Sequence, residues 1–317
     1  MKKKTAGKVM EFQKTVANEI RCHGIGLHTG RKVNMTIRPG EADSGVVFIR
    51  KDLSKDAVVE ARLENVCDTT LATTIGVNGT RISTVEHLLS AFRGAGVDNA
   101  VVEIDCCEIP IMDGSARPFV ALLKNGGLKS QERPRRWMVI ERPVSVSDGE
   151  GEAAFLPSSS FKITYTIEFN HPLVKTQNYS MFFSPEGYEQ GISPARTFGF
   201  LKDVEYLQAK GLALGGSLKT AVVLDETKVI NKEGLRFPDE FVRHKILDAV
   251  GDLFLLGMPI LGHFVAKKSG HKLNNMLLEK LLTCRDCWKV VDQSAAFPRE
   301  KGPVRVAGPS LQSATLL

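Results

Sequence analysis

Residues 234–257 read GLRFPDEFVRHKILDAVGDLFLLG, and this stretch predicts a helix of roughly five turns around which the chain is organised. Pro238 and the two acidic residues after it are typical of a helix start, because proline lacks the amide hydrogen that goes unused there. Gly257 and Pro259 are typical of a helix end, since glycine caps helices and proline prevents their continuation.

The two faces of this helix differ in chemistry. One broad side is apolar, whereas His244, Asp248 and Asp252 follow one another at four-residue steps on the opposite side. A histidine and an aspartate one turn apart, pointing the same way, can hold one divalent metal ion. The alternative is an ordinary solvated helix face, and the pattern alone does not decide between them.

The composition is that of a soluble globular protein. The 317 residues suffice for two domains, and 43% of them are apolar and 25% charged. The sequence lacks the combined basic and aromatic pattern of a nucleic-acid binder. Its net charge of +6 suits an anionic substrate. No window is apolar enough for a membrane span or a signal peptide. We therefore expect a cytoplasmic protein without stable membrane insertion.

Six cysteines do not form a disulfide framework in a chain of this kind. Cys284 and Cys287 make a single CxxC pair, and a zinc site would need a second pair at suitable spacing. The adjacent Cys106 and Cys107 do not supply one. We expect reduced, structural thiols.

The order of strand and helix patterns predicts two α+β domains. The polar segment LKSQERPRR, residues 128–136, is the expected boundary between a domain of residues 15–130 and one of residues 131–298. In both halves two helices are expected to start 33 residues apart, which suggests duplicated architecture. Residues 1–14 are expected to be a flexible extension and residues 299–317 a loose tail.

Two further segments give clear local predictions. Residues 161–169, FKITYTIEF, alternate strictly between apolar and polar types, which predicts a half-buried antiparallel strand. Residues 82–96, ISTVEHLLSAFRGAG, predict a helix over 83–93. Ser83 and Glu86 fit a capping box there, which would explain the glutamate and leave the histidine after it unexplained.

A hydrolytic zinc site needs three protein ligands and one position left open for water. His244 and Asp248 supply two candidates, and His87 on the helix of the first half could supply the third. Nothing in the spacing shows that the two helices meet. On this evidence the site is a hypothesis only.

Two further residues could move the protons of such a reaction. Glu86 would lie beside the metal-bound water and could remove its proton, while zinc lowers the pKa of that water toward about 7. His271 follows a glycine in a predicted loop and could protonate a departing amine. Asp252 could hold this histidine in its protonated form.

Several long motifs occur in order between residues 24 and 275. They are GIGLHTG, RISTVEHLLSAF, EIPIMDGSARPF, ARTFGF, GLRFPDEFVRHKILDAVGDL and KSGHKLNN. Together they resemble the UDP-3-O-acyl-N-acetylglucosamine deacetylases, the zinc amidases of lipid A synthesis in Gram-negative bacteria. The resemblance implies two similar α+β domains, each a sheet layered on helices, with the active site between them. It also implies these site residues: zinc ligands His87, His244 and Asp248, general base Glu86 and general acid His271.

The resemblance implies further roles near the metal. Thr197 would help hold the amide oxygen as it becomes an oxyanion, Lys245 would contact substrate, and Asp252 would support His271. An insert near residues 193–221 would build a hydrophobic passage for an acyl chain. Its apolar residues include Phe198, Phe200, Leu201 and Leu212, for which an ordinary small core is the alternative explanation.

Some positions stay outside this scheme. Some relatives carry a cysteine in the segment DTTLATTI, where this chain has Ala72, Thr73 and Thr74 and so offers no thiol to the metal. His23 and His28, beside the glycine-rich turn, are interpreted as loop histidines. His263 lies in an apolar strand and is interpreted as a packed core histidine.

The implied function is zinc-dependent removal of the N-acetyl group from UDP-3-O-acyl-N-acetylglucosamine, giving UDP-3-O-acyl-glucosamine and acetate. The alternative is a noncatalytic nucleotide-sugar or acyl-chain binding protein, which would need neither a metal nor a base. The joint presence of the candidate ligands, base and acid favours the enzyme. We expect a monomer, because the sequence has no heptads and no additional apolar helix.

Overall fold

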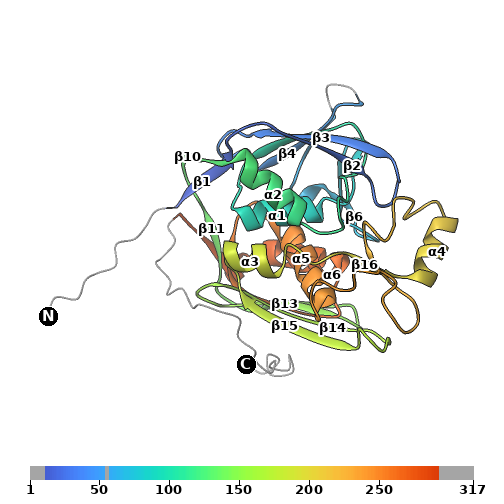
Figure 1. Ribbon diagram of the computed structural model, residues 1–317. Coiled ribbons are helices and arrows are strands. Elements are labelled where there is room, and N and C mark those ends of the chain that lie inside the picture. The colour runs from blue at the N-terminus through green and yellow to red at the C-terminus, as the bar shows by residue number, and fades with distance from the viewer. Residues whose placement is uncertain (1–10, 54–56, 293–317) are drawn as a thin grey trace.

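The computed structural model describes residues 11–53 and 57–292 and has the predicted α+β architecture in four layers. In Figure 1 the sheet of the first half lies at the top and the sheet of the second half at the bottom. Helices α1, α2, α5 and α6 lie between the two sheets. Both halves therefore face each other through their helices.

The first half consists of a five-stranded sheet, a small three-stranded sheet and two helices. The large sheet has the order β2 (Ile20–Ile25), β3 (Lys32–Pro39), β9 (Ala100–Ile104), β4 (Val46–Arg50) and β5 (Val58–Glu60). The small sheet contains β6 (Val66–Asp68), β7 (Thr74–Val77) and β8 (Thr80–Ile82). The helices are α1 (Glu86–Ala95) and α2 (Arg117–Gly126).

The second half has a seven-stranded sheet centred on β18 (Ile260–Lys267). The other strands are β11 (Trp137–Ile140), β12 (Val144–Ser147), β13 (Glu152–Leu156), β14 (Phe161–Glu168), β15 (Thr176–Phe182) and β19 (Trp288–Val291). Its two helices are α5 (Glu240–Phe254) and α6 (His271–Thr283). β14 confirms the strand predicted from strict alternation, but it is antiparallel only to β15 and runs parallel to β18.

The same strand pairing occurs in both halves. β9 is antiparallel to β3 and parallel to β4, and β18 is antiparallel to β13 and parallel to β14. The helix starts lie 31 residues apart in each half, from 86 to 117 and from 240 to 271. The duplicated architecture suggested by the sequence is therefore present in the topology, although the spacing differs from the expected 33.

Helix α5 is buried on all sides, because the first half covers its polar face. His244, Asp248 and Asp252 are only 3%, 4% and 3% exposed. At Gly251 an added Cβ would lie 2.0 Å from the carbonyl oxygen of Glu86, so α5 contacts the backbone of α1 directly. The solvated-face interpretation of this helix is therefore wrong.

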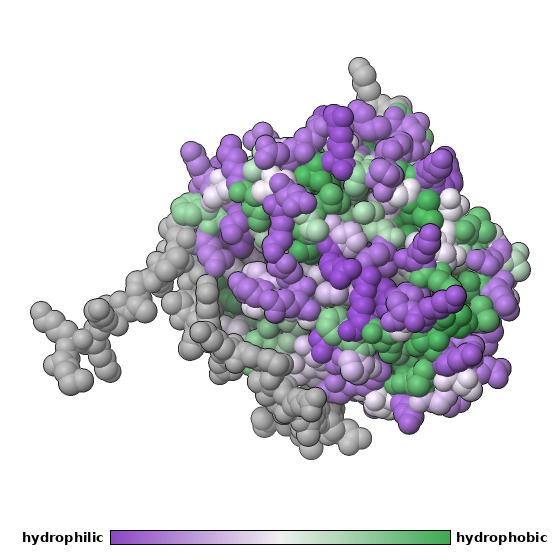
Figure 2. Space-filling model, viewed as in Figure 1, coloured by the Kyte–Doolittle hydropathy of each residue, from purple (hydrophilic) through white to green (hydrophobic). Residues whose placement is uncertain are grey.

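The segment expected to form the insert is a small βαβ unit. β16 (Phe198–Phe200) pairs in parallel with β17 (Val222–Leu224), and α4 (Leu201–Ala209) connects them. The short helix α3 (Pro185–Gly191) precedes this unit. No residue of α4 is buried. In Figure 1 α4 projects at the right, and Figure 2 shows green apolar surface on that side.

The segment predicted to contain the domain boundary forms a strand. β10 (Leu128–Pro134) pairs antiparallel with β1 (Phe12–Val16) from the start of the chain. β1 begins within the expected extension of residues 1–14. Residues 1–10 and the expected tail, residues 299–317, lie outside the described residues. None of the described helices combines the length and apolarity needed to cross a bilayer.

The prediction of reduced thiols is wrong for one pair. Cys284 and Cys287 form a disulfide across the turn that follows α6, where their Cα atoms lie 5.4 Å apart, a separation that a disulfide spans readily. Cys22, Cys67 and the pair at 106 and 107 are free thiols.

Candidate active site

Three candidate metal ligands converge where the two halves meet. His87 comes from α1, and His244 and Asp248 come from α5. One ligand atom of each lies within 4.8 Å of the others. Asp248 Oδ1 is 3.5 Å from His87 Nε2 and 3.3 Å from His244 Nε2. The structure therefore brings together the three residues that the sequence predicted.

The donor set fits a catalytic zinc ion, which takes nitrogen and oxygen ligands from three side chains and keeps one position open. His244 Nδ1 lies 3.1 Å from the carbonyl oxygen of Ala195 and donates to it, which leaves Nε2 as the metal-facing nitrogen. Burial lowers the pKa of His244 to about 4. The ring is therefore neutral and able to act as a ligand.

The carboxylate of Asp248 stays ionised although it is buried. Burial opposes its charge, but nearby positive charge, which includes the Lys245 ammonium, holds the pKa of Asp248 well below the usual value. Lys245 Nζ donates to Asp248 Oδ2 at 2.8 Å, and the same pairing raises the pKa of Lys245. Lys245 thus sits directly beside the candidate metal position.

Glu86 is the first residue of α1 and does not act as a cap. Val85 occupies the N-cap position without a side-chain hydrogen bond, so the predicted capping box is wrong. Ser83 instead lies in a β-bridge to Glu108, and the positive φ of Thr84, 59°, turns the chain into the helix. The side chain of Glu86 points into the site, where burial raises its pKa.

His271 is the first residue of α6 and not a loop residue as expected. Its Nδ1 lies 2.9 Å from Asp252 Oδ2, and its Nε2 lies 3.9 Å from Glu86 Oε1. Burial disfavours the charged ring, but the charge and hydrogen bond of Asp252 outweigh it and raise the pKa of His271 to about 9. His271 therefore carries an extra proton at neutral pH.

These groups line one cavity of about 580 Å³. Thr197, Lys245, Phe198 and Phe200 also line it, as expected from their predicted roles. The predicted Leu201 and Leu212 are not among its lining residues and are 39% and 37% exposed.

One wall of the cavity is aromatic. The ring centroid of Phe169 lies 5.8 Å from that of Phe198 and 5.9 Å from that of Phe200. Phe198 also stacks edge-on against the buried Phe241 of α5, at 4.9 Å. Leu207 of α4 extends the apolar lining. The wall therefore leads from the metal position toward the βαβ unit.

Sequence reasoning missed several lining residues. Phe169 ends the alternating segment of residues 161–169, and its position there could have identified it. His28 lies in a turn, as predicted, and it lines the cavity with both ring nitrogens buried and without a hydrogen-bond partner among the described residues. Lys268 and Lys272 flank His271 at the rim. The family motifs GIGLHTG and KSGHKLNN contain three of these four residues.

Two of the remaining histidines, His23 and His263, do not line the cavity. His23 lies exposed on β2. His263 on β18 is half-buried, and its Nε2 lies 2.8 Å from the hydroxyl of Thr164. The core interpretation of His263 is thus only partly right, because its ring lies on the outer face of the sheet, beside Lys162 and Phe182.

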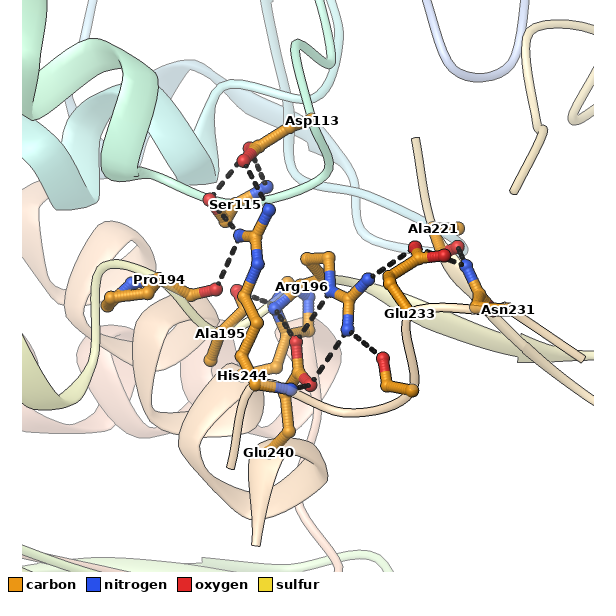
Figure 3. A network of polar contacts seen from close by, with 12 residues as sticks. Asp113, Ser115, Pro194, Ala195, Arg196, Ala221, Asn231, Glu233, Glu240 and His244 are labelled. Atoms are coloured by element: carbon orange, nitrogen blue, oxygen red, sulfur yellow. Dashed lines mark hydrogen bonds and ion pairs between the residues drawn. The ribbon is translucent and has the colours of Figure 1, made fainter. Parts of the chain in front are cut away.

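Figure 3 shows the polar network that holds the carbonyl oxygen bonded to His244. Arg196 follows Ala195 in the chain and donates to Glu240 from its backbone N, Nε and Nη2, at 3.0, 2.8 and 3.1 Å. Glu240 begins α5, one turn before His244. The segment that orients the histidine is therefore tied to the helix that carries it.

The same network reaches the first half. Arg236 donates from its backbone N to Glu240 Oε2 at 2.6 Å and from its guanidinium to Asp113 Oδ2 and the carbonyl oxygen of Pro194, each at 2.8 Å. Thr197 N donates to the carbonyl oxygen of Gly114 at 2.7 Å. The position of Thr197 thus depends on both halves.

Replacing one partner of the buried pair should destabilise the protein. The side chain of Glu240 is fully buried, and Glu240→Gln leaves the Arg196 guanidinium without its buried carboxylate partner, which should cost about 3–5 kcal/mol of unfolding free energy. The control is Glu233→Gln, because Glu233 also pairs with Arg196 at 3.0 Å but its side chain is 59% exposed. Urea unfolding should show little change for the control. Equally small effects of both substitutions would contradict the stabilising role of the buried pair of Arg196 and Glu240.

Comparison with known proteins identifies the family of the chain. The family described as LpxC, UDP-3-O-acyl N-acetylglycosamine deacetylase, matches residues 13–283. The UDP-3-O-acyl-N-acetylglucosamine deacetylase of Syntrophus aciditrophicus is 61% identical over 302 residues, covering 93% of this chain and 96% of that protein. The protein of that name from Pseudomonas entomophila is 51% identical over 281 residues, covering 88% and 93%. The chain therefore belongs to the LpxC family of UDP-3-O-acyl N-acetylglycosamine deacetylases.

Proposed function

We propose that the protein is a zinc-dependent amidohydrolase of lipid A biosynthesis in the cytoplasm. It removes the N-acetyl group of UDP-3-O-acyl-N-acetylglucosamine and releases UDP-3-O-acyl-glucosamine and acetate. The observation that carries the proposal is the buried triad of His87, His244 and Asp248 beside Glu86 and His271 in one cavity. The family and the names of the relatives support the same substrate.

Zinc held by the triad would supply Lewis-acid polarisation of the amide carbonyl and acidify the attacking water. The chain's own groups move the protons. Glu86 Oε2 accepts a hydrogen bond from the backbone N of Thr73, so Oε1 is the oxygen that takes the proton from water. The water oxygen then bonds to the acetyl carbon, and His271 Nε2 gives its proton to the nitrogen as the C–N bond breaks.

Other lining residues suit the rest of the reaction. The hydroxyl of Thr197 and the ammonium of Lys245 face the cavity beside the triad and would stabilise negative charge on the former amide oxygen and orient the sugar. Lys268 and Lys272 at the rim offer positive charge to a diphosphate. The aromatic wall of Phe169, Phe198 and Phe200 would receive the acyl chain. A binding protein would explain the apolar wall but not the buried acid and base.

Chelation should abolish acetate release from UDP-3-O-acyl-N-acetylglucosamine, and one equivalent of zinc should restore it. Glu86→Gln and His271→Ala should each keep one zinc per chain and lower kcat by about 100-fold or more, because each removes a proton-transfer group. His263→Gln, outside the cavity, is the control and should change kcat little. Substrate binding without acetate release at any zinc concentration would favour the binding protein, and normal turnover of Glu86→Gln would remove the base.

The dependence of kcat/KM on pH should be bell-shaped. His271 acts in its protonated form, so activity should fall as pH rises through about 9, the raised pKa of this residue. Glu86 acts in its ionised form, and burial raises its pKa. As the pH decreases, the activity should therefore begin to fall at a higher pH than the ordinary pKa of a glutamate would give. In His271→Ala the remaining activity should lack the alkaline fall. An unchanged alkaline fall would assign the acid to another group.

A further inference from the structure

Thr73 contacts both proton-transfer groups and the aspartate behind them. It lies just before β7 and is 2% exposed. Its backbone N donates to Glu86 Oε2 at 3.0 Å, and its hydroxyl oxygen lies 2.6 Å from Asp252 Oδ1 and 3.2 Å from His271 Nδ1. Thr73 belongs to the first half, whereas Asp252 and His271 belong to the second. It therefore joins the base and the acid across the interface.

The direction of these hydrogen bonds follows from the number of available protons. A threonine hydroxyl has one hydrogen, and an ionised carboxylate can only accept. The short contact therefore uses the hydroxyl hydrogen for Asp252 Oδ1, and a lone pair of Thr73 Oγ1 faces His271. Nδ1 of His271 is thus surrounded by acceptors: Thr73 Oγ1 and both oxygens of Asp252, at 3.1 and 2.9 Å.

This arrangement assigns the two nitrogens of His271 different tasks. Because Nδ1 faces only acceptors, it keeps its hydrogen whether the ring is charged or neutral. The proton that leaves and returns is then the one on Nε2, which faces Glu86 Oε1 at 3.9 Å. Asn274 Nδ2 donates to Asp252 Oδ2 at 2.8 Å, so both carboxylate oxygens have a donor besides the histidine.

We propose that Thr73 is a positioning residue that aligns the general base with the general acid. Its N–H turns the free oxygen of Glu86 toward the cavity, and its hydroxyl fixes Asp252 and thereby the ring of His271. The catalytic meaning of this alignment rests on the proposed function. A role in packing alone would affect the stability of the protein but not the state of the histidine ring.

Thr73→Val tests the hydroxyl separately from the backbone contact, because valine keeps the branched shape and the N–H. We expect kcat to fall about tenfold, with KM and zinc content unchanged, since one buried hydrogen bond behind the acid is lost. Thr73→Ser should restore kcat. The substitution should have no further effect in a His271→Ala background, because Thr73 acts through that ring.

The matched control is Thr74→Val. This neighbouring hydroxyl is also buried but donates to Ser83 Oγ at 3.0 Å, away from the acid and base. It should change the melting temperature about as much as Thr73→Val and leave kcat unchanged. An unchanged kcat in Thr73→Val, or an equal loss in the control, would overturn the proposal. If the valine variant does not fold, Thr73→Ala carries the same comparison.

Nuclear magnetic resonance of protein labelled with ¹⁵N in histidine gives a readout that needs no substrate. The wild type should show His271 protonated at Nδ1 with slow exchange of that hydrogen, and Thr73→Val should exchange it faster. Identical ring signals in both proteins would overturn the proposal even if deacetylation is observed. Absence of acetate release by the wild type would instead contradict the proposed function. The comparison of the His271 ring signals between the wild type and Thr73→Val would still test the role of Thr73.

Discussion

The direct contact between α1 and α5 is the constraint on which the site depends. At Gly251 any side chain would collide with the backbone of Glu86, so α5 lies directly on the first turn of α1. This approach brings His87 of one half within 3.5 Å of Asp248 of the other. The candidate metal ligands therefore come from both halves, and neither half contains all three alone.

Burying this many ionisable groups is costly unless each has a partner. Asp248 is paired with Lys245, Asp252 with His271, and the structural carboxylate Glu240 with Arg196. Each pair has at least one member on α5, so one helix carries two of the candidate ligands, the aspartate that contacts His271 and the buried glutamate at its own first turn. This explains why a helix with charged side chains can lie at the centre of the fold.

Local patterns predicted much of the fold, but they could not predict contacts across it. The alternation of residues 161–169 and the end signals of α5 depend on neighbours in sequence, and the strand and the helix both lie within a few residues of the predicted ranges. The polar face of α5 was open to two explanations, because its burial depends on what the first half places against it, and α1 covers it. The capping box at Ser83 does not form because Ser83 pairs with Glu108, a contact that the local pattern does not contain. The role of Thr73 had no local signal, since its partners are up to 198 residues away.

Anomalous diffraction at the zinc edge, from crystals of the zinc-loaded protein, tests the central claim most directly. The account predicts one strong peak per chain between the two halves, about 2.0–2.2 Å from Nε2 of His87, Nε2 of His244 and a carboxylate oxygen of Asp248. A peak that lacks His87 among its ligands, or that lies elsewhere in the chain, would contradict a metal site shared by the two halves.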